Sequence, residues 1–197
     1  MVYSKRQYSD GTIIGIWKIE ETVEQMLCRY PHLRKYGVEQ LFRNDGRRLE
    51  YLCVRALLAE LTNDATLAID YEESGKPVMP DRFVSISHTK GYAALILSQA
   101  GPVAVDIEKI SEIGDVVAER FIRPDEQAPD NSRRLVIWSA KESLYKYFSE
   151  ERLGYFDMYI HANENALAAE NLKSHKRVEV MCELTPDFVL TFILPQS

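Results

Sequence analysis

The first half of the chain alternates between β-like apolar runs and segments in which apolar residues recur at helical spacing. Runs rich in β-branched residues predict strands, whereas apolar residues three and four positions apart predict one buried helix face. Pro31 ends the first helical segment, and Gly91 closes a turn between two neighbouring apolar runs. We therefore predict a strand at 13–19, helices at 21–30 and 47–61, and a hairpin with strands at 83–87 and 92–98.

The second half begins at Gly101 and Pro102 and repeats this order of patterns. The segment 11–18 can be laid over 101–108, which suggests a structural repeat in which only the second copy carries an acidic pair. An exposed loop rich in proline and polar residues separates its two helical segments. The pattern predicts strands at 103–108, 155–160, 176–184 and 188–194, and helices at 116–121 and 133–148.

Composition and charge describe an ordinary globular protein. Of the 197 residues, 46% are hydrophobic and 27% are charged, and 24 basic against 30 acidic residues give a net charge of −6. This balance disfavours a protein that neutralises a phosphate backbone, so we expect no nucleic-acid partner. No apolar run is long enough to cross a bilayer, and Cys28, Cys53 and Cys182 lie at distant spacings. We expect buried free thiols, no membrane association and a cytoplasmic location.

Two carboxylates stand at alternate positions of the predicted strand 103–108. Side chains at i and i+2 of a strand project to the same face, so Asp106 and Glu108 should lie side by side. Adjacent carboxylates repel each other unless a cation or proton lies between them, and hard oxygen ligands suit Mg²⁺. In a chain with 30 acidic residues this spacing also arises by chance, so the spacing alone favours an ordinary solvated pair.

The second-half helix carries further candidates in the segment 138–146, Trp-Ser-Ala-Lys-Glu-Ser-Leu-Tyr-Lys. Glu142 and Lys146 are four residues apart and share one helix face, where the simplest interpretation is a surface ion pair. Glu142 is also a third possible oxygen ligand, and Lys141 and Lys146 are cations that could meet a phosphate. His88, at the end of a predicted strand, is by itself more typical of a surface residue.

These signals become specific through their order along the chain. The order is Gly75-Lys-Pro77, Ser85-Ile-Ser-His-Thr89, Val103-Ala-Val-Asp-Ile-Glu-Lys109, Arg120-Phe121 with Glu126, and the segment 138–146. Over about residues 47–148 the chain resembles the 4'-phosphopantetheinyl transferases of the Sfp type. Members of this family move the phosphopantetheine arm of coenzyme A onto a serine of an apo acyl or peptidyl carrier protein and release adenosine 3',5'-bisphosphate.

The resemblance implies the fold and the arrangement of the site. We expect a monomer of the α+β class with two halves, 1–100 and 101–197, related by pseudo-twofold symmetry. Each half should be a small, mainly antiparallel sheet packed with helices. The active site should lie in the cleft between them, with coenzyme A contacts in the first half and metal-binding carboxylates in the second.

The resemblance also assigns roles to the acidic residues and the lysine of the second half. Asp106, Glu108 and Glu142 resemble the Mg²⁺ ligands of the family, with Mn²⁺ as an alternative ion. Lys146 resembles the lysine beside the coenzyme A pyrophosphate, and Glu142 has also been assigned there to activating the serine. Glu142, Lys146 and Asp106 are therefore the candidate catalytic residues.

The coenzyme A contacts of the first half follow in the same way. Four residues of two motifs resemble family contacts to coenzyme A, and the histidine among them would lie near the 3'-phosphate. A further nucleotide-phosphate contact stands at the start of the first-half helix, where the alignment leaves two neighbouring arginines open. The expected contacts are Lys76, Pro77, Ser87 and His88, together with either Arg47 or Arg48.

The chain departs from the family pattern at several positions. Ala104 stands where the family usually has glycine, Ser85 and Thr89 replace the usual neighbours of the Ser-His pair, and the glycine-containing continuation after Lys146 is absent.

Two other enzyme classes fit the sequence less well. A Mg²⁺-dependent nuclease needs an acid-x-Lys pair, but Glu108 directly precedes Lys109. A P-loop kinase needs a GxxxxGK[ST] motif, which the chain does not contain. The remaining alternative is a catalytically silent module that binds coenzyme A or a carrier protein.

Overall fold

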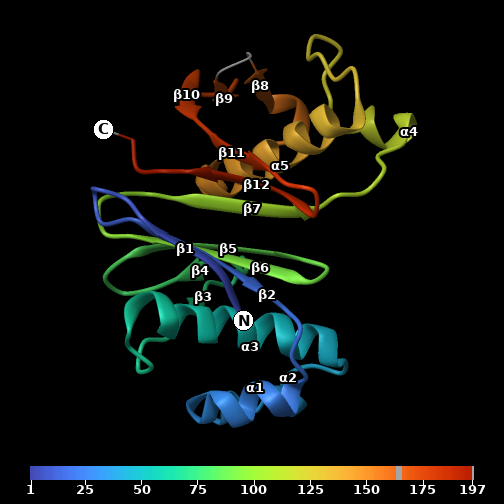
Figure 1. The fold of residues 1–197 in the computed structure, drawn as a ribbon. Helices are drawn as coiled ribbons and strands as arrows, with labels where there is room; N and C mark the ends of the chain where they lie inside the picture. Colours follow the sequence, from blue (N-terminus) through green and yellow to red (C-terminus); the bar gives the residue numbers. More distant parts are fainter. Residues whose placement is uncertain (163–165, 197) are drawn as a thin grey trace. The chain divides into compact units, whose positions relative to one another are not determined.

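The computed structural model describes residues 1–162 and 166–196 of the chain. The chain divides into two compact units, Met1–Ala100 and Gly101–Ser197. Both units combine helices with small antiparallel sheets, as expected for the α+β class (Figure 1). Each unit is built around one long helix and has its own hydrophobic core.

The N-terminal unit places one long helix on a four-stranded sheet. Its elements are β1 (Val2–Gln7), β2 (Ile13–Lys18), α1 (Val23–Arg29), η1 (Pro31–Tyr36), α2 (Val38–Leu41), α3 (Asp45–Thr62), β3 (Asp70–Tyr71), β4 (Pro77–Val78), β5 (Phe83–Thr89) and β6 (Tyr92–Ser98). The antiparallel sheet has the order β1-β2-β6-β5, and α3 runs along one of its faces (Figure 1). The Asn44 side chain caps α3 by accepting a hydrogen bond from the Arg47 backbone N–H, and Asn63 ends the helix in the left-handed conformation.

The core of this unit lies between α3 and the sheet. Leu57 and Leu61 of α3 are buried with Trp17 of β2 and Leu95 of β6. Gly15 of β2 faces the helix so closely that an added Cβ would lie 2.8 Å from a methyl of Leu61 and 2.9 Å from a methyl of Leu57. A side chain at this position would therefore require the packed side chains of Leu57 and Leu61 to move.

The C-terminal unit has two three-stranded antiparallel sheets, in the orders β11-β12-β7 and β10-β9-β8. Its elements are β7 (Ala104–Lys109), α4 (Asp115–Ala118), α5 (Asn131–Tyr147), η2 (Ser149–Glu151), η3 (Tyr155–Asp157), β8 (Met158–Ala162), β9 (Leu167–Asn171), β10 (Lys176–Glu179), β11 (Met181–Leu184) and β12 (Phe188–Ile193). The Asp130 side chain caps α5 by accepting a hydrogen bond from the Arg133 backbone N–H. The helix α5 contacts strands of both sheets, and Leu135, Val136, Ile137, Ala140 and Leu144 are its buried contribution to the core of this unit.

Both units contain the same series of elements: an opening strand, a long helix, and a hairpin whose second strand pairs with the opening strand. The series is β2, α3 and β5–β6 in the first unit, and β7, α5 and β11–β12 in the second. Ile16 pairs with Ala94, and Asp106 pairs with Thr191 at the corresponding position. The shared topology supports the structural repeat expected from the overlay of 11–18 on 101–108, while the pseudo-twofold relation of the halves stays a prediction.

Several predicted elements differ in detail. The strands β1 and β9 were not predicted, because their sequences mix polar residues and alanine with few large apolar ones. The run 176–184 forms two strands of different sheets, since the chain passes from one sheet to the other at Val180. The segment 155–160 begins with the 3₁₀ turn η3 before β8, and the helix expected at 116–121 is the shorter α4.

The cysteines are free thiols, but they are not all buried. Cys53 lies in the core of the N-terminal unit, as expected, whereas Cys28 and Cys182 are exposed, so the prediction was wrong for these two. Cys28 follows the buried Met26 and Leu27 on α1 and points outward, and Cys182 lies on the edge strand β11. In the part of the chain that the structure describes, no helix combines the length and the apolar character needed to span a bilayer.

Candidate active site

Asp106 and Glu108 project from β7 toward α5, as the strand alternation predicts. Asp106 is only 3% exposed, and its Oδ2 accepts a hydrogen bond of 2.9 Å from the Ser139 hydroxyl. Its other oxygen, Oδ1, lies 2.8 Å from Lys146 Nζ. Lys146 also donates to the backbone carbonyl of Val105 at 3.0 Å. The lysine is therefore fixed to the strand by an ion pair and by a second hydrogen bond.

A chain of buried hydroxyls supports Asp106 from behind. Ser139 Oγ lies 2.9 Å from Thr191 Oγ1, which lies 2.8 Å from Ser143 Oγ. Ser143 also donates to the Thr191 backbone carbonyl at 3.1 Å. The two serines are one helical turn apart on α5, and Thr191 pairs with Asp106 in the sheet, so the network joins helix and sheet at the carboxylate.

Each glutamate of the candidate site accepts a hydrogen bond from an aromatic side chain. Trp138 Nε1 donates to Glu108 Oε1 at 2.7 Å, and the Tyr155 hydroxyl donates to Glu142 Oε1 at 3.1 Å. The two aromatic rings contact each other, with centroids 5.4 Å apart. Burial and the nearby Glu142 charge raise the pKa of Tyr155 to about 12, so its hydroxyl remains a donor at neutral pH.

The carboxylates destabilise one another's charged forms. Burial raises the pKa of Glu108, and the charge of Asp106 raises it further. Burial is also the largest cause of the raised pKa of Glu142, followed by the charge of Asp106. The Lys146 ammonium lowers both values. A second cation among these carboxylates would relieve the remaining repulsion.

The donor atoms suit a hard divalent cation. Glu108 Oε2 and Glu142 Oε2 accept no hydrogen bond from any residue that the structure describes, while Oε1 of each is held by its aromatic partner. Carboxylate oxygens are the ligands that Mg²⁺ prefers. Within residues 1–162 and 166–196, no three acidic, histidine or cysteine side chains are assembled closely enough to hold an ion. The residues therefore fit Mg²⁺ in kind and retain available oxygens, without forming a complete ligand set.

The N-terminal unit brings two other candidate residues, Arg47 and His88, together with Glu50. Arg47 Nη1 lies 3.4 Å from His88 Nε2 and 3.1 Å from Glu50 Oε2, and the same Glu50 oxygen lies 3.6 Å from His88 Nδ1. Arg47 and Glu50 are one turn apart at the start of α3, and His88 is near the end of β5. This group places two potentially cationic side chains beside one carboxylate, on a partly exposed surface.

Arg48 has a different environment. Its Nε donates to the Phe42 carbonyl at 3.0 Å, its Nη2 donates to the Glu39 carbonyl at 3.3 Å, and its Nη1 pairs with Asp45 at 2.9 Å. Its guanidinium therefore holds the connection between α2 and α3. Of the two arginines that the sequence left open, Arg47 is the one beside His88.

The other expected coenzyme A contacts lie on neighbouring elements of the same unit. Ser87 is buried on β5 and pairs with Ala94. Lys76 and Pro77 lie in the β3–β4 hairpin, whose turn contains Gly75 in a left-handed conformation with φ of 84°. A residue with a side chain would be strained at that position.

Lys141 was expected as a cation that could meet a phosphate, and the structure corrects this. Its side chain is 0% exposed, and Nζ lies 2.7 Å from Glu126 Oε2. Nζ also donates to the carbonyls of Phe121 and Tyr155, at 2.7 Å and 3.1 Å. Every donor of this ammonium is used inside the unit, so it is not available to a ligand.

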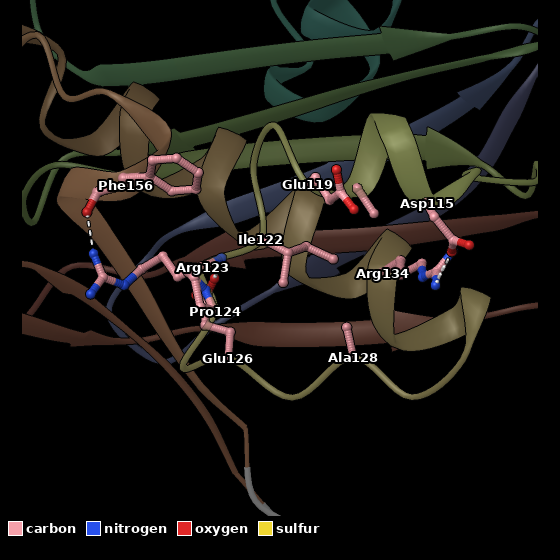
Figure 2. A pocket seen from close by; sticks show the side chains of 10 residues that line it. Asp115, Glu119, Ile122, Arg123, Pro124, Glu126, Ala128, Arg134 and Phe156 are labelled. Carbon is pink, nitrogen blue, oxygen red and sulfur yellow. Dashed lines mark hydrogen bonds and ion pairs between the residues drawn. The ribbon is translucent and has the colours of Figure 1, made fainter.

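A pocket of about 580 Å³ lies beside α4 and the start of α5 (Figure 2). Arg134 Nη2 is 2.6 Å from Asp115 Oδ1, and Arg123 Nη1 donates to the Phe156 carbonyl. None of the site residues expected from the sequence lines this pocket. Its lining consists of Asp115, Ala118, Glu119, Ile122, Arg123, Pro124, Glu126, Ala128, Arg134 and Phe156.

Five residues of the carboxylate site were given no role from the sequence: Trp138, Ser139, Ser143, Tyr155 and Thr191. Trp138 is one helical turn before Glu142 on α5, so helical spacing could have linked the two. Tyr155 is 13 residues beyond Glu142 and lies past the end of α5 and the 3₁₀ turn η2, so no local pattern could have placed its hydroxyl on that carboxylate.

Comparison with protein-family models gives a match in the C-terminal unit. Residues 102–192 match the family model described as the 4'-phosphopantetheinyl transferase superfamily. The match contains β7 and α5, and with them Asp106, Glu108, Glu142 and Lys146. The second unit, from residue 102 to residue 192, is therefore similar to the 4'-phosphopantetheinyl transferase superfamily.

Two curated members of the superfamily are similar to part of the chain. The 4'-phosphopantetheinyl transferase ffp of Bacillus subtilis is 32% identical over 47% of this chain and 47% of the relative. The 4'-phosphopantetheinyl transferase HetI of Nostoc sp. (strain PCC 7120) is 28% identical over 39% of each chain. The matched region thus spans about half of the length of these relatives or less.

Proposed function

We propose that this protein transfers the 4'-phosphopantetheine group of coenzyme A to a serine of an apo acyl or peptidyl carrier protein, in a Mg²⁺-dependent reaction. The observation that carries the proposal is the contact between the buried Asp106 carboxylate and Lys146, 2.8 Å apart, inside the segment that matches the superfamily. Glu108 and Glu142 lie close enough for the charge of Asp106 to raise the pKa of both. Both curated relatives carry the name of this transferase.

The proposed reaction is a phosphoryl-type displacement. The serine Oγ forms a bond to the phosphorus of the phosphopantetheine group, and the bond from that phosphorus to the leaving phosphate of adenosine 3',5'-bisphosphate breaks. The serine proton passes to Glu142 or to a water that this carboxylate orients. Lys146 places a positive charge beside the pyrophosphate, where negative charge develops on the leaving group.

Asp106, Glu108 and Glu142 would hold the divalent ion. When bound, Mg²⁺ neutralises charge on the pyrophosphate. The buried hydroxyl network of Ser139 and Thr191 keeps Asp106 in place, since both contacts are fixed by helix and sheet. The chain's own contribution is therefore a fixed Asp106 carboxylate and the lysine paired with it, both positioned before substrate arrives.

Binding of coenzyme A would use the charged group of the N-terminal unit. Arg47 and His88 are the proposed contacts to the 3'-phosphate, because their nitrogens are only 3.4 Å apart and both side chains are partly exposed. Ser87, Lys76 and Pro77 are further proposed contacts on the neighbouring β5 and the β3–β4 hairpin. The monomeric state and the cytoplasmic location stay predictions from the sequence.

The test is a mass measurement on carrier proteins. The protein is incubated with coenzyme A, Mg²⁺ and a panel of apo acyl and peptidyl carrier proteins, and the intact mass of each carrier is followed. A gain of one phosphopantetheine group is expected on at least one carrier. Asp106→Asn should slow the gain at least about 100-fold, because losing a metal ligand costs no less than losing a residue that supports one.

The control variant removes a carboxylate from elsewhere in the same unit. Asp115→Asn, at the pocket in Figure 2, should transfer at the wild-type rate. No mass gain on any carrier, together with retained coenzyme A binding by calorimetry, would instead support the silent binding module. A wild-type rate in Asp106→Asn would remove that carboxylate from the proposed mechanism.

A further inference from the structure

Trp138 and Tyr155 form an aromatic pair that joins the two glutamates of the carboxylate site. Trp138 holds Glu108 on β7, and Tyr155 holds Glu142 on α5, with hydrogen bonds of 2.7 Å and 3.1 Å. The rings are inclined by 37° with centroids 5.4 Å apart, and Phe121 packs edge-on against Trp138 at 5.0 Å. Two carboxylates from different elements are thus oriented by a single aromatic cluster.

The turn that carries Tyr155 is fixed by the surrounding structure. The buried Lys141 ammonium donates to the Tyr155 carbonyl at 3.1 Å, and Arg123 donates to the carbonyl of the next residue, Phe156. Asp157 Oδ2 accepts the Gly154 backbone N–H at 2.7 Å at the start of η3. Because three consecutive residues are anchored, the hydroxyl of Tyr155 is presented to Glu142 from a rigid segment.

We propose that Tyr155 is a positioning residue whose hydroxyl holds Glu142 Oε1 so that Oε2 is presented to a divalent cation. Glu142 has three side-chain torsions, and without this hydrogen bond its carboxylate can turn away from Asp106 and Glu108. Trp138 does the same for Glu108 on the other side of the pair. Residues that orient metal ligands in this way typically account for 10–100-fold in metal affinity or activity. The inference rests on the proposed function, since the cation is the one assigned there to these carboxylates.

The experiment measures binding of Mn²⁺, used as the probe ion, by the full-length protein. Unbound Mn²⁺ is followed by its electron paramagnetic resonance signal, with coenzyme A present and no carrier protein, so no turnover occurs. Tyr155→Phe keeps the ring and removes only the hydroxyl, and it should weaken Mn²⁺ binding by about 10-fold. Tyr159→Phe is the matched control, because the Tyr159 hydroxyl donates to the Asp125 backbone carbonyl and not to a carboxylate of the site. It should bind Mn²⁺ like the wild type.

A second variant and a kinetic readout separate positioning from a structural role. Tyr155→His retains a ring N–H donor and should recover part of the affinity that Tyr155→Phe loses. With a carrier protein present, Tyr155→Phe should raise the Mn²⁺ concentration needed for half-maximal rate and leave the KM for coenzyme A unchanged. Thermal unfolding of each variant checks that the fold is retained.

The outcomes distinguish failure of the inference from failure of the proposed function. Wild-type Mn²⁺ affinity in Tyr155→Phe would overturn the inference and leave the proposed function standing. Equal losses in Tyr155→Phe and Tyr155→His, with normal folding, would also overturn it, because the donor would then not matter. If the wild-type protein binds Mn²⁺ no better than Asp106→Asn, the metal site itself is absent, and both proposals fail.

Discussion

Lys141 Nζ and Glu126 Oε2 lie 2.7 Å apart, and the two side chains are 0% and 1% exposed. The lysine also donates to the carbonyls of Phe121 and Tyr155, and Glu126 Oε1 accepts the Ile160 backbone N–H at 2.7 Å. This ion pair joins α5 to the loop after α4, to η3 and to β8. Lys141 is adjacent in sequence to Glu142. The ion pair nevertheless takes no part in the candidate site except through the turn that carries Tyr155.

Replacing Lys141 should strongly destabilise the C-terminal unit. Lys141→Met leaves the Glu126 carboxylate buried without its cation, which typically costs about 3–5 kcal/mol in the free energy of unfolding. Urea unfolding followed by circular dichroism measures the loss. Lys18→Met is the control, because Lys18 pairs with Glu20 at 2.7 Å on the surface, where a pair contributes about 0–1 kcal/mol.

The double variant Lys141→Met with Glu126→Gln tests the cause of the loss. Removing both charges should recover a substantial part of the stability, because no unpaired charge is then buried. If Lys141→Met alone loses no more than Lys18→Met, the buried pair does not stabilise the unit as described.

Adding one methyl group at Gly15 should destabilise the N-terminal unit. In Gly15→Ala the new Cβ would lie within 2.9 Å of methyl groups of Leu57 and Leu61, so these packed side chains must move, at a cost of about 1–3 kcal/mol. Thermal unfolding measures the change. Gly114→Ala is the control, because nothing lies within 4 Å of a Cβ there. If both substitutions lowered the stability equally, the close contacts at Gly15 would not be the cause of the loss.

Local periodicity predicted the faces of the candidate site but not its central contact. Strand alternation placed Asp106 beside Glu108, and helical spacing placed Glu142 on the face of Lys146. The simplest interpretation of Glu142 and Lys146 was that they pair with each other on the surface. Lys146 instead pairs with Asp106, 40 residues earlier in the chain. That contact depends on how α5 packs against β7, which no short-range pattern specifies.

The residues that sequence reasoning misplaced depend on tertiary packing. Lys141 is four residues after Ile137 and three before Leu144, both buried, so helical spacing did place it on the buried face. A lysine is expected in solvent unless a partner is known, and its partner Glu126 lies in an irregular loop. The proposal of Arg47 rather than Arg48 as a coenzyme A contact also depends on tertiary structure, because only the structure places His88 beside Arg47.

The Cys53 thiol should be unreactive in the folded protein. Burial raises its pKa to about 12, so at pH 8 only about one molecule in 10⁴ carries the thiolate. In the variant Cys28→Ser with Cys182→Ser, an aromatic disulfide reagent should label Cys53 only after unfolding. A variant that keeps only the exposed Cys28 is the control, and rapid native labelling of Cys53 at pH 8 would contradict its burial.

Arg47 and Arg48 should have separable roles, although they are adjacent in the sequence. Arg47→Ala removes a cation beside His88, and we expect the KM for coenzyme A to rise about 10-fold with unchanged kcat and stability, because a charge-assisted bond to phosphate is lost. Arg48→Ala removes the bonds to the Phe42 and Glu39 carbonyls, so the free energy of unfolding should fall by about 1–2 kcal/mol with little change in KM. Steady-state kinetics with coenzyme A varied, and urea unfolding, measure both effects. The reverse pattern would make Arg48 the phosphate contact and Arg47 a residue of the helix surface.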